Sequence, residues 1–269
     1  MTLTSIAFGS VIGMVLGLTG AGGGILAVPA LVLGMGMNMT QATPIALMAV
    51  GSAALLGALD GLRKGLVRYK AAFLMALLGS IISPLGIWIA HQVSSLFLMT
   101  LFSLIMLLVA LRMLLQVWKS SRRQHVPTTL HKQCMINPAT GKLHWNWKSS
   151  SILATVGSIS GLFTGMLGVG GGFLIVPALK HFSNISMHGI VATSLMVIAL
   201  ISMSSVASAL VSGAQISIAG WYFITAAVGG MLAGRLIAPS LPERWLQAGF
   251  ALITILVSLL LMSRAYLSN

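Results

Sequence analysis

Eight apolar runs of about 20 residues or more follow one another along this 269-residue chain. They lie near residues 3–33, 42–62, 71–91, 95–118, 150–179, 189–212, 218–240 and 245–266. An α-helix needs about 20 apolar residues to cross the roughly 30 Å hydrocarbon layer of a bilayer. Only 6% of the residues are charged, whereas ordinary soluble domains carry about a quarter. The sequence therefore predicts an all-α polytopic membrane protein.

The runs form two homologous copies of a four-segment unit. A shift of 148 positions places residues 9–31 on residues 157–179 with 13 identities in 23 positions, and a spacing near 150 continues through the later runs. The expected organisation is a first membrane repeat at 1–118, a basic cytoplasmic linker at 119–148 and a second membrane repeat at 149–269.

The first apolar run of each copy is too long for one straight span. A helix of 31 residues would be about 46 Å long. Glycine destabilises helix interiors, so we expect each run to break at its glycine cluster. The clusters are Gly20, Gly22, Gly23 and Gly24 in the first copy and Gly168, Gly170, Gly171 and Gly172 in the second. Three further glycines upstream in each copy, at Gly9, Gly13 and Gly17 and at Gly157, Gly161 and Gly165, are predicted to let another helix approach closely.

Each helix is expected to restart after its glycines, near Ile25 and near the equivalent Phe173. The first N–H groups of a restarted helix lack intrahelical partners and lie at the positive end of the dipole, so they attract anions. Pro29 and Pro177 lack an N–H group, and the carbonyls of Ile25 and Phe173 are therefore expected to lose their helical partners. Paired discontinuous helices in two repeats are typical of a transporter's substrate site. The alternative is that the glycines only allow tight packing.

Hydroxyl side chains open the second run of each copy and are further candidates for binding. Thr43 in the first copy, and Thr193 and Ser194 in the second, could donate hydrogen bonds to an anion held at the breaks. Hydroxyls in membrane helices also bond to their own i−4 carbonyl or to a neighbouring helix, which is the alternative. His91 and His188 stand at segment ends, where a histidine usually faces the interface.

The charge of the chain is strongly unbalanced, with 15 basic and two acidic residues and a formal charge of +13. The basic residues gather in short polar stretches, which indicates topology signals and contact with anionic lipid rather than nucleic-acid binding. Asp60 stands close to Lys64 and is expected to form a local ion pair at the membrane surface. Arg235 is the deepest basic residue, and either snorkels to the headgroups or lends positive charge to an anion path.

Motifs for nucleotides, metals and catalysis are missing from the sequence. No Gly-Lys-Ser/Thr ending follows the glycines, and the next acid is Asp60, which excludes a P-loop and a dinucleotide fingerprint. His125, His131, Cys134 and His144 have spacings that do not match a zinc site. Paired intramembrane acids and a nucleophile with a base are also missing, so we expect no enzyme activity, no cofactor and no metal.

The positive-inside rule separates two topologies. If all eight runs span, 12 basic residues lie inside and 3 outside. If the first and fifth runs are re-entrant hairpins folded at their glycines, the second copy is inverted, with 14 basic residues inside and only Arg264 outside. The second arrangement fits the rule better, so we predict inverted repeats.

Several of these motifs together resemble the TauE/SafE family of sulfite exporters. They are two copies of GxGGG followed by xxxPAL, an Ala-Thr-(Pro/Ser) element opening each second run, and a cationic central loop. The resemblance covers nearly the whole chain, although residues 212–217 lack the charge of the commoner second-repeat pattern.

Membership of this family implies secondary transport of small sulfur-containing anions, such as sulfite, sulfonates or thiosulfate, across the inner membrane of a prokaryotic cell. In this interpretation the anion is held at the paired broken-helix N-termini, and the two repeats alternate its access to each side. An anion channel would use the same parts and is the alternative. The expected partners are the small anion and the lipid bilayer, and a homodimer is left open.

Overall fold

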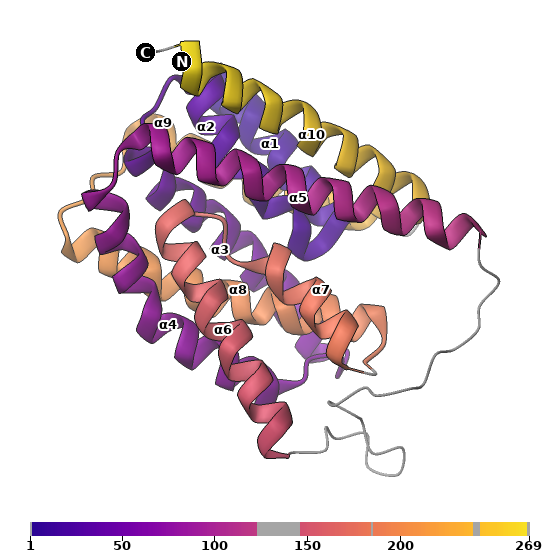
Figure 1. Ribbon diagram of the computed structural model, residues 1–269. Helices are drawn as coiled ribbons and strands as arrows, with labels where there is room; N and C mark the ends of the chain where they lie inside the picture. The colour runs from indigo at the N-terminus through magenta and orange to yellow at the C-terminus, as the bar shows by residue number, and fades with distance from the viewer. Residues whose placement is uncertain (1, 123–145, 184, 239–242, 268–269) are drawn as a thin grey trace.

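The computed structural model describes residues 2–122, 146–183, 185–238 and 243–267, which are almost entirely helical (Figure 1). The elements in order are α1 (Thr2–Thr19), the 3-10 helix η1 (Gly20–Leu26), α2 (Ala27–Met35), α3 (Met39–Arg63), α4 (Tyr69–Gln92), α5 (Ser95–Arg122), α6 (Trp147–Leu167), α7 (Gly172–Phe182), α8 (Met187–Val211), α9 (Ile218–Ile237) and α10 (Glu243–Leu267).

Eight of the described helices are long and apolar enough to cross a membrane, and α2 and α7 are shorter apolar helices. The eight are α1, α3, α4, α5, α6, α8, α9 and α10. This confirms the predicted all-α protein with eight apolar segments. The outer helices α5 and α10 lie side by side (Figure 1) and carry many exposed leucines, including Leu104, Leu108 and Leu256, as lipid-facing helices do.

The chain reverses direction at the first glycine cluster. Ser5, near the start of α1, donates a hydrogen bond to the Sδ atom of Met35, the last residue of α2, at 3.7 Å. In one straight helix these two residues would lie about 45 Å apart. A Cβ atom added to Gly34 would also meet the ring of Phe8 at 2.6 Å. Helices α1 and α2 therefore form a hairpin that begins and ends at the same end of the molecule.

A second reversal follows α6. Gly168, Gly170 and Gly171 all have positive φ angles, of 72°, 73° and 69°, which residues with a side chain rarely adopt. A Cβ atom added to Gly171 would lie 3.0 Å from the Cβ atom of Ser160, eleven residues earlier. The chain has therefore turned back on α6, and Figure 1 shows α7 leaving the tip of α6.

Helices that are distant in the sequence form the most extensive pairs, which are α1 with α9, α4 with α6, α3 with α8 and α5 with α10. Glycines of α1 lie so close to α9 that an added Cβ atom would overlap the main chain of α9. The contacts are Gly9 with Phe223, Gly13 with Ala227 and Gly17 with Met231. Glycines of α6 touch α4 in the same way: Gly157 at Met75, Gly161 at Gly79 and Gly165 at Ser83. The close helix contacts predicted for both sets of glycines are confirmed.

Helices α3 and α8 form the centre of the bundle and are the most buried of the candidate spans. They run antiparallel, because Gly51 of α3 touches Ser202 near the end of α8, whereas Gly61 touches Ala192 near its start. Both hairpins pack around this central pair, which brings the glycine breaks to the middle of the fold.

Candidate functional site

The two glycine breaks meet beside α3. A Cβ atom added to Gly24 would lie 3.2 Å from the carbonyl oxygen of Val169 and 2.9 Å from Cγ1 of Val50. A Cβ atom added to Gly170 would lie 3.2 Å from the same methyl group of Val50. Two segments about 150 residues apart in the sequence are thus in contact, and all four of these residues are buried.

The first break is a tight turn of helix rather than an open loop. Gly20, Gly22, Gly23 and Gly24 lie in the 3-10 helix η1, and the α-helix restarts at Ala27, two residues later than the predicted Ile25. Pro29 is the third residue of α2, which follows η1 without a gap. Because proline has no N–H group, the carbonyl of Ile25 in the preceding turn loses its usual donor, as expected from the sequence.

The second break is an open loop that ends at a helix N-terminus. Helix α7 begins at Gly172, one residue before the predicted Phe173. The amides of Leu174 and Ile175 both donate to the carbonyl of Gly171, at 3.1 and 3.2 Å. The amides of Gly172 and Phe173 precede these bonds in the first turn of α7, where intrahelical acceptors are lacking. Pro177 lies inside α7, so the carbonyl of Phe173 loses its usual donor as expected.

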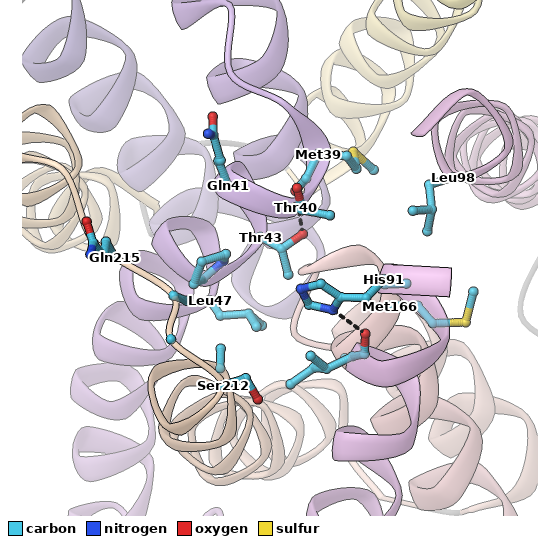
Figure 2. A pocket seen from close by; sticks show the side chains of 17 residues that line it. Met39, Thr40, Gln41, Thr43, Leu47, His91, Leu98, Met166, Ser212 and Gln215 are labelled. Atoms are coloured by element: carbon cyan, nitrogen blue, oxygen red, sulfur yellow. Dashed lines mark hydrogen bonds between the residues drawn. The ribbon is translucent and has the colours of Figure 1, made fainter. Parts of the chain in front are cut away.

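A cavity of about 320 Å³ adjoins the second break (Figure 2). It is lined by the starts of α3 and α5, the ends of α4, α6 and α8, and the loop that leads to α9. Gly165 and Met166, from the last turn of α6, form part of its wall. Its polar lining residues are Thr40, Gln41, Thr43, His91, Ser212 and Gln215. Thr43 joins cavity and break, because its Cα atom lies 2.9 Å from where a Cβ atom on Gly168 would be.

The three predicted hydroxyl ligands are already hydrogen-bonded within the protein. Thr43 donates to the carbonyl of Met39 at 2.8 Å (Figure 2), and Ser194 donates to the carbonyl of Ile190 at 2.8 Å. Thr193 accepts a hydrogen bond from the amide of Arg68 at 3.0 Å. Thr43 alone of the three lines the cavity.

His91 lines the cavity and is exposed in the last turn of α4. Its Nδ1 atom is 2.8 Å from the carbonyl oxygen of Ile87, and its ring points toward Thr43 (Figure 2). The cavity joins ends of five helices from separate parts of the chain. No local sequence pattern could have assembled it, since it depends on how those helices pack.

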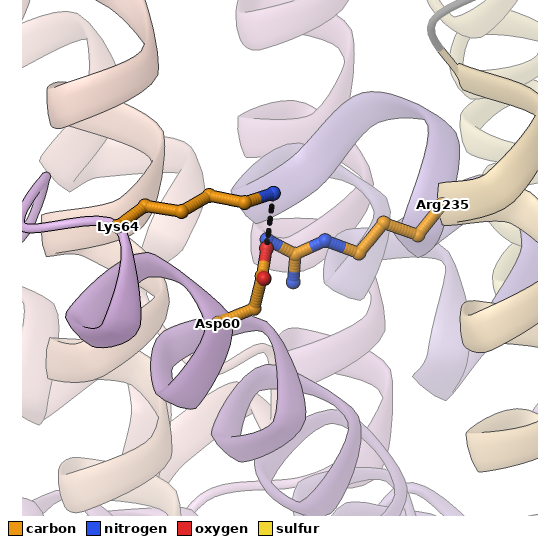
Figure 3. A network of polar contacts seen from close by, with 3 residues as sticks. All are labelled: Asp60, Lys64 and Arg235. Atoms are coloured by element: carbon orange, nitrogen blue, oxygen red, sulfur yellow. Dashed lines mark hydrogen bonds and ion pairs between the residues drawn. The ribbon is translucent and has the colours of Figure 1, made fainter.

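Arg235 is held in an ion pair with Asp60. Its Nη2 atom lies 2.6 Å from Oδ2 of Asp60, and Nζ of Lys64 lies 2.9 Å from the same oxygen (Figure 3). The predicted local ion pair of Asp60 is confirmed, and Arg235 is an additional partner that links α9 to α3. A carboxylate thus compensates the charge that was considered for an anion path.

No group of three or more His, Cys, Asp or Glu side chains that could hold a metal ion occurs among the described residues. His125, His131, Cys134 and His144 lie outside the described residues.

These features define a multi-pass helical membrane protein with a central pair of helix breaks. The model of the family described as sulfite exporter TauE/SafE matches residues 5–261, and the chain belongs to this family of membrane transporters, which are not enzymes.

The chain is also similar over nearly its whole length to bacterial proteins. Two from Xylella fastidiosa, strains Temecula1 and 9a5c, are 30% and 29% identical over 99% of this chain and 97% of each relative. The protein YunE of Bacillus subtilis strain 168 is 26% identical over 95% of this chain and 94% of its own length. All three bear the name "Probable membrane transporter protein". No solved structure shows a significant match.

Proposed function

We propose that this protein is a secondary transporter of small sulfur-containing anions, of the sulfite, sulfonate or thiosulfate class, in the inner membrane of a bacterial cell. The observation that carries the proposal is the contact between the two breaks, at Gly24 and Val169. Amides at a helix N-terminus suit an anion. Broken helices that meet between two halves of a chain are the arrangement expected of a secondary transporter.

The proposal includes an inverted-repeat architecture, in which residues 1–118 and 149–269 are equivalent units joined by the linker 119–148. It is supported by matching contacts: Gly13 of α1 touches Ala227 of α9, and Gly161 of α6 touches Gly79 of α4, each pair shifted by 148 positions. The antiparallel course of α3 and α8 is also what inversion requires. The two hairpins then enter the membrane from opposite sides and meet at their glycines.

In the proposed cycle, an anion binds where the breaks meet, and rocking of one unit against the other exposes it to each side in turn. The cavity beside Thr43 and His91 is the approach from one side. The basic residues at the opposite end of the molecule, Arg235 among them, attract the anion there. Since Arg235 is paired with Asp60, it would contribute to the path only when that ion pair opens.

Flux measurements on the purified protein in proteoliposomes test this function. We expect saturable uptake of at least one of sulfite, thiosulfate, taurine and sulfoacetate, with sulfate as a comparison and with or without an imposed proton gradient. Uptake that responds to the gradient supports a carrier, whereas unsaturated high conductance indicates the alternative, an anion channel. Flux no greater than in protein-free liposomes for every anion contradicts the proposal.

The Gly24→Ala variant tests the meeting of the breaks in the same assay. The added methyl group would lie 2.9 Å from Val50 and 3.2 Å from the Val169 carbonyl, so the two breaks must separate by a few tenths of an ångström. We expect transport to slow several-fold. Gly249→Ala is the control, because a Cβ atom on Gly249 meets nothing within 4 Å. Equal rates in the two variants would show that the contact has no role in transport.

A further inference from the structure

Five buried hydroxyl side chains lie at the second break and beside the wall of the cavity. We call them the hydroxyl seam: Ser83 of α4, Ser160 and Thr164 of α6, and Ser202 and Ser205 of α8, each 0% exposed. At the cavity end, Oγ of Ser83 lies 3.0 Å from where a Cβ atom on the cavity-lining Gly165 would be. At the other end the seam reaches the break itself.

The contacts at the break come from two helices. Oγ of Ser202 lies 3.4 Å from the Cβ position of Gly170, and Oγ1 of Thr164 lies 2.9 Å from that of Gly171. Both glycines directly precede the first amides of α7. Hydroxyl groups and helix N-terminal amides therefore lie within one small, fully buried region.

Two hydroxyl groups of the seam have unused protons. Thr164 donates to the carbonyl of Ser160 at 2.6 Å. Ser205 lies 2.7 Å from the carbonyl of Ile201 and pairs with the hydroxyl of Ser83. The hydroxyls of Ser160 and Ser202 are buried without a hydrogen-bond partner among the described residues. Because an unpaired buried hydroxyl destabilises a fold, two of them beside one helix N-terminus indicate that a ligand completes their bonding.

Among the described residues, the first break lacks such surroundings. The positions equivalent to Ser160 and Thr164, 148 residues earlier, are Ile12 and Leu16. Gly165 contacts Ser83, whereas the equivalent Gly17 contacts Met231. The position equivalent to Ser205, 150 residues earlier, is Leu55. Ser52 stands 150 residues before Ser202, but its hydroxyl donates to the carbonyls of Met48 and Ala49, at 2.6 and 3.1 Å. Hydroxyls with unused protons thus occur at the second break and are replaced or paired at the first.

We propose that the substrate anion binds at the second break alone, where Ser160 and Ser202 donate hydrogen bonds to its oxygen atoms beside the amides of Gly172 and Phe173. This inference rests on the proposed function and narrows it. The first break is a packing counterpart that holds the second in place. The binding site is therefore asymmetric and is approached through the cavity beside Thr43.

The donors of this site also define the charge of its ligand. The hydrogen bonds of the seam have no charged partner, and the described lining of the cavity contains no lysine or arginine. The penalty for desolvating an ion rises with the square of its charge, and neutral donors without a cation offset less of it for a dianion than for a monoanion. The site therefore selects a singly charged oxyanion, such as hydrogensulfite or an alkyl sulfonate, over the sulfate dianion.

Alanine variants of the two serines, with Ser52→Ala as the matched control, test the assignment. Uptake of hydrogensulfite into proteoliposomes is measured at mildly acidic pH, where sulfite is mostly the monoanion. We expect KM to rise about tenfold or more in Ser202→Ala and in Ser160→Ala, because each loses a hydrogen bond to a charged group. In Ser52→Ala we expect a change of less than about twofold, since that hydroxyl bonds only to its own helix.

The melting temperature distinguishes a role of Ser202 in binding from a role in stability. The melting temperature of Ser202→Ala without substrate should equal or exceed that of the wild type, because the variant removes an unpaired buried hydroxyl. A lowered melting temperature with an unchanged KM would assign Ser202 a structural role and overturn the inference. Equal KM values in Ser202→Ala, Ser160→Ala and Ser52→Ala would do the same.

Competition between anions tests the charge of the ligand. Methanesulfonate should inhibit hydrogensulfite uptake at a concentration at least about tenfold lower than sulfate does, because the site lacks a cation to offset a second charge. Equal inhibition by the two anions would overturn the assignment of a singly charged ligand. A wild-type protein that transports thiosulfate but not hydrogensulfite would overturn this inference and leave the proposed function standing. A wild type that transports none of the sulfur anions would refute the proposed function itself.

Discussion

Asp60 contacts two cations from different parts of the chain. Lys64 directly follows the last residue of α3, whereas Arg235 comes from α9, 175 residues later. The Asp60 and Arg235 side chains are 37% and 32% exposed, so water screens the interaction. Ion pairs of this kind contribute little to stability. The role of this ion pair is to position the end of α9 against α3.

A double-mutant cycle on Asp60→Asn and Arg235→Gln separates pairing from an electrostatic role in transport. We expect each single variant to lower the melting temperature by a few degrees or less, and the double variant to be no less stable than the worse single variant. Thermal unfolding in detergent gives the three values. Lys64→Gln is the control, since it leaves the Arg235 contact in place. Transport that falls several-fold with Arg235→Gln in the Asp60→Asn background would instead assign Arg235 to the anion path.

Individual residues were predictable to different degrees. The restart of the second helix at Gly172 was predicted within one residue, because three glycines and a distant proline leave few other positions. The 3-10 form of the first break was not predicted, since glycine permits both a tight helix and an open loop. Ser160 was missed, although its replacement of Ile12 in the aligned copies was visible in the sequence.

Among the helices, α1 and α9 approach each other through glycine on both sides. Gly230 of α9 touches Ser10 of α1, where an added Cβ atom would overlap the main-chain carbonyl. Gly229, its neighbour, has nothing within 4 Å of the same position. Of these two adjacent glycines, Gly230 therefore packs against α1, whereas Gly229 faces open space.

This difference predicts opposite effects of the same substitution. Gly230→Ala should destabilise the protein by about 1–3 kcal/mol, as overpacking does. Gly229→Ala should be neutral or stabilising by up to about 1 kcal/mol, because alanine favours the helix over glycine. Thermal unfolding of the two purified variants measures both values. Similar melting temperatures would contradict the close contact of α1 with α9.

The sequence did not predict which helix packs against each glycine-rich helix. Small residues four apart predict that some helix approaches closely, and the structure confirms this for both sets. Which helix it is depends on the packing of the whole bundle, and no local pattern in residues 9–17 points to α9. The cavity was missed for the same reason.

At the scale of the whole molecule, the two hairpins and the antiparallel pair α3 and α8 determine which loops lie at which end of the bundle. The start of α1, the loop before α3 and the loop before α9 lie at one end, and the loop before α4 lies at the other. The positive-inside rule predicts that the latter end is cytoplasmic, because 14 of the 15 basic residues then lie inside.

Single cysteines in a Cys134→Ser background test this topology. We expect Thr2→Cys, Asn38→Cys and Gln215→Cys to react with an impermeant maleimide from the external side, and Lys64→Cys only after the membrane is permeabilised. Opposite sides for Thr2→Cys and Asn38→Cys would mean that the first run crosses the membrane and is not re-entrant. Cytoplasmic labelling of Gln215→Cys would exclude the inverted arrangement. The Cys134→Ser protein without a new cysteine is the blank for both reagents.

The pairing of α1 with α9 has a consequence for the order of synthesis. Roughly 200 residues separate the end of α1 from the start of α9, which takes roughly 10 to 40 seconds to translate at typical rates. During that interval the glycines of α1 lack the partner helix that they contact in the folded protein. Until α9 has been synthesised, the incompletely packed hairpin must therefore be kept from wrong associations. Its packing is completed only by α9, which lies in the last third of the chain.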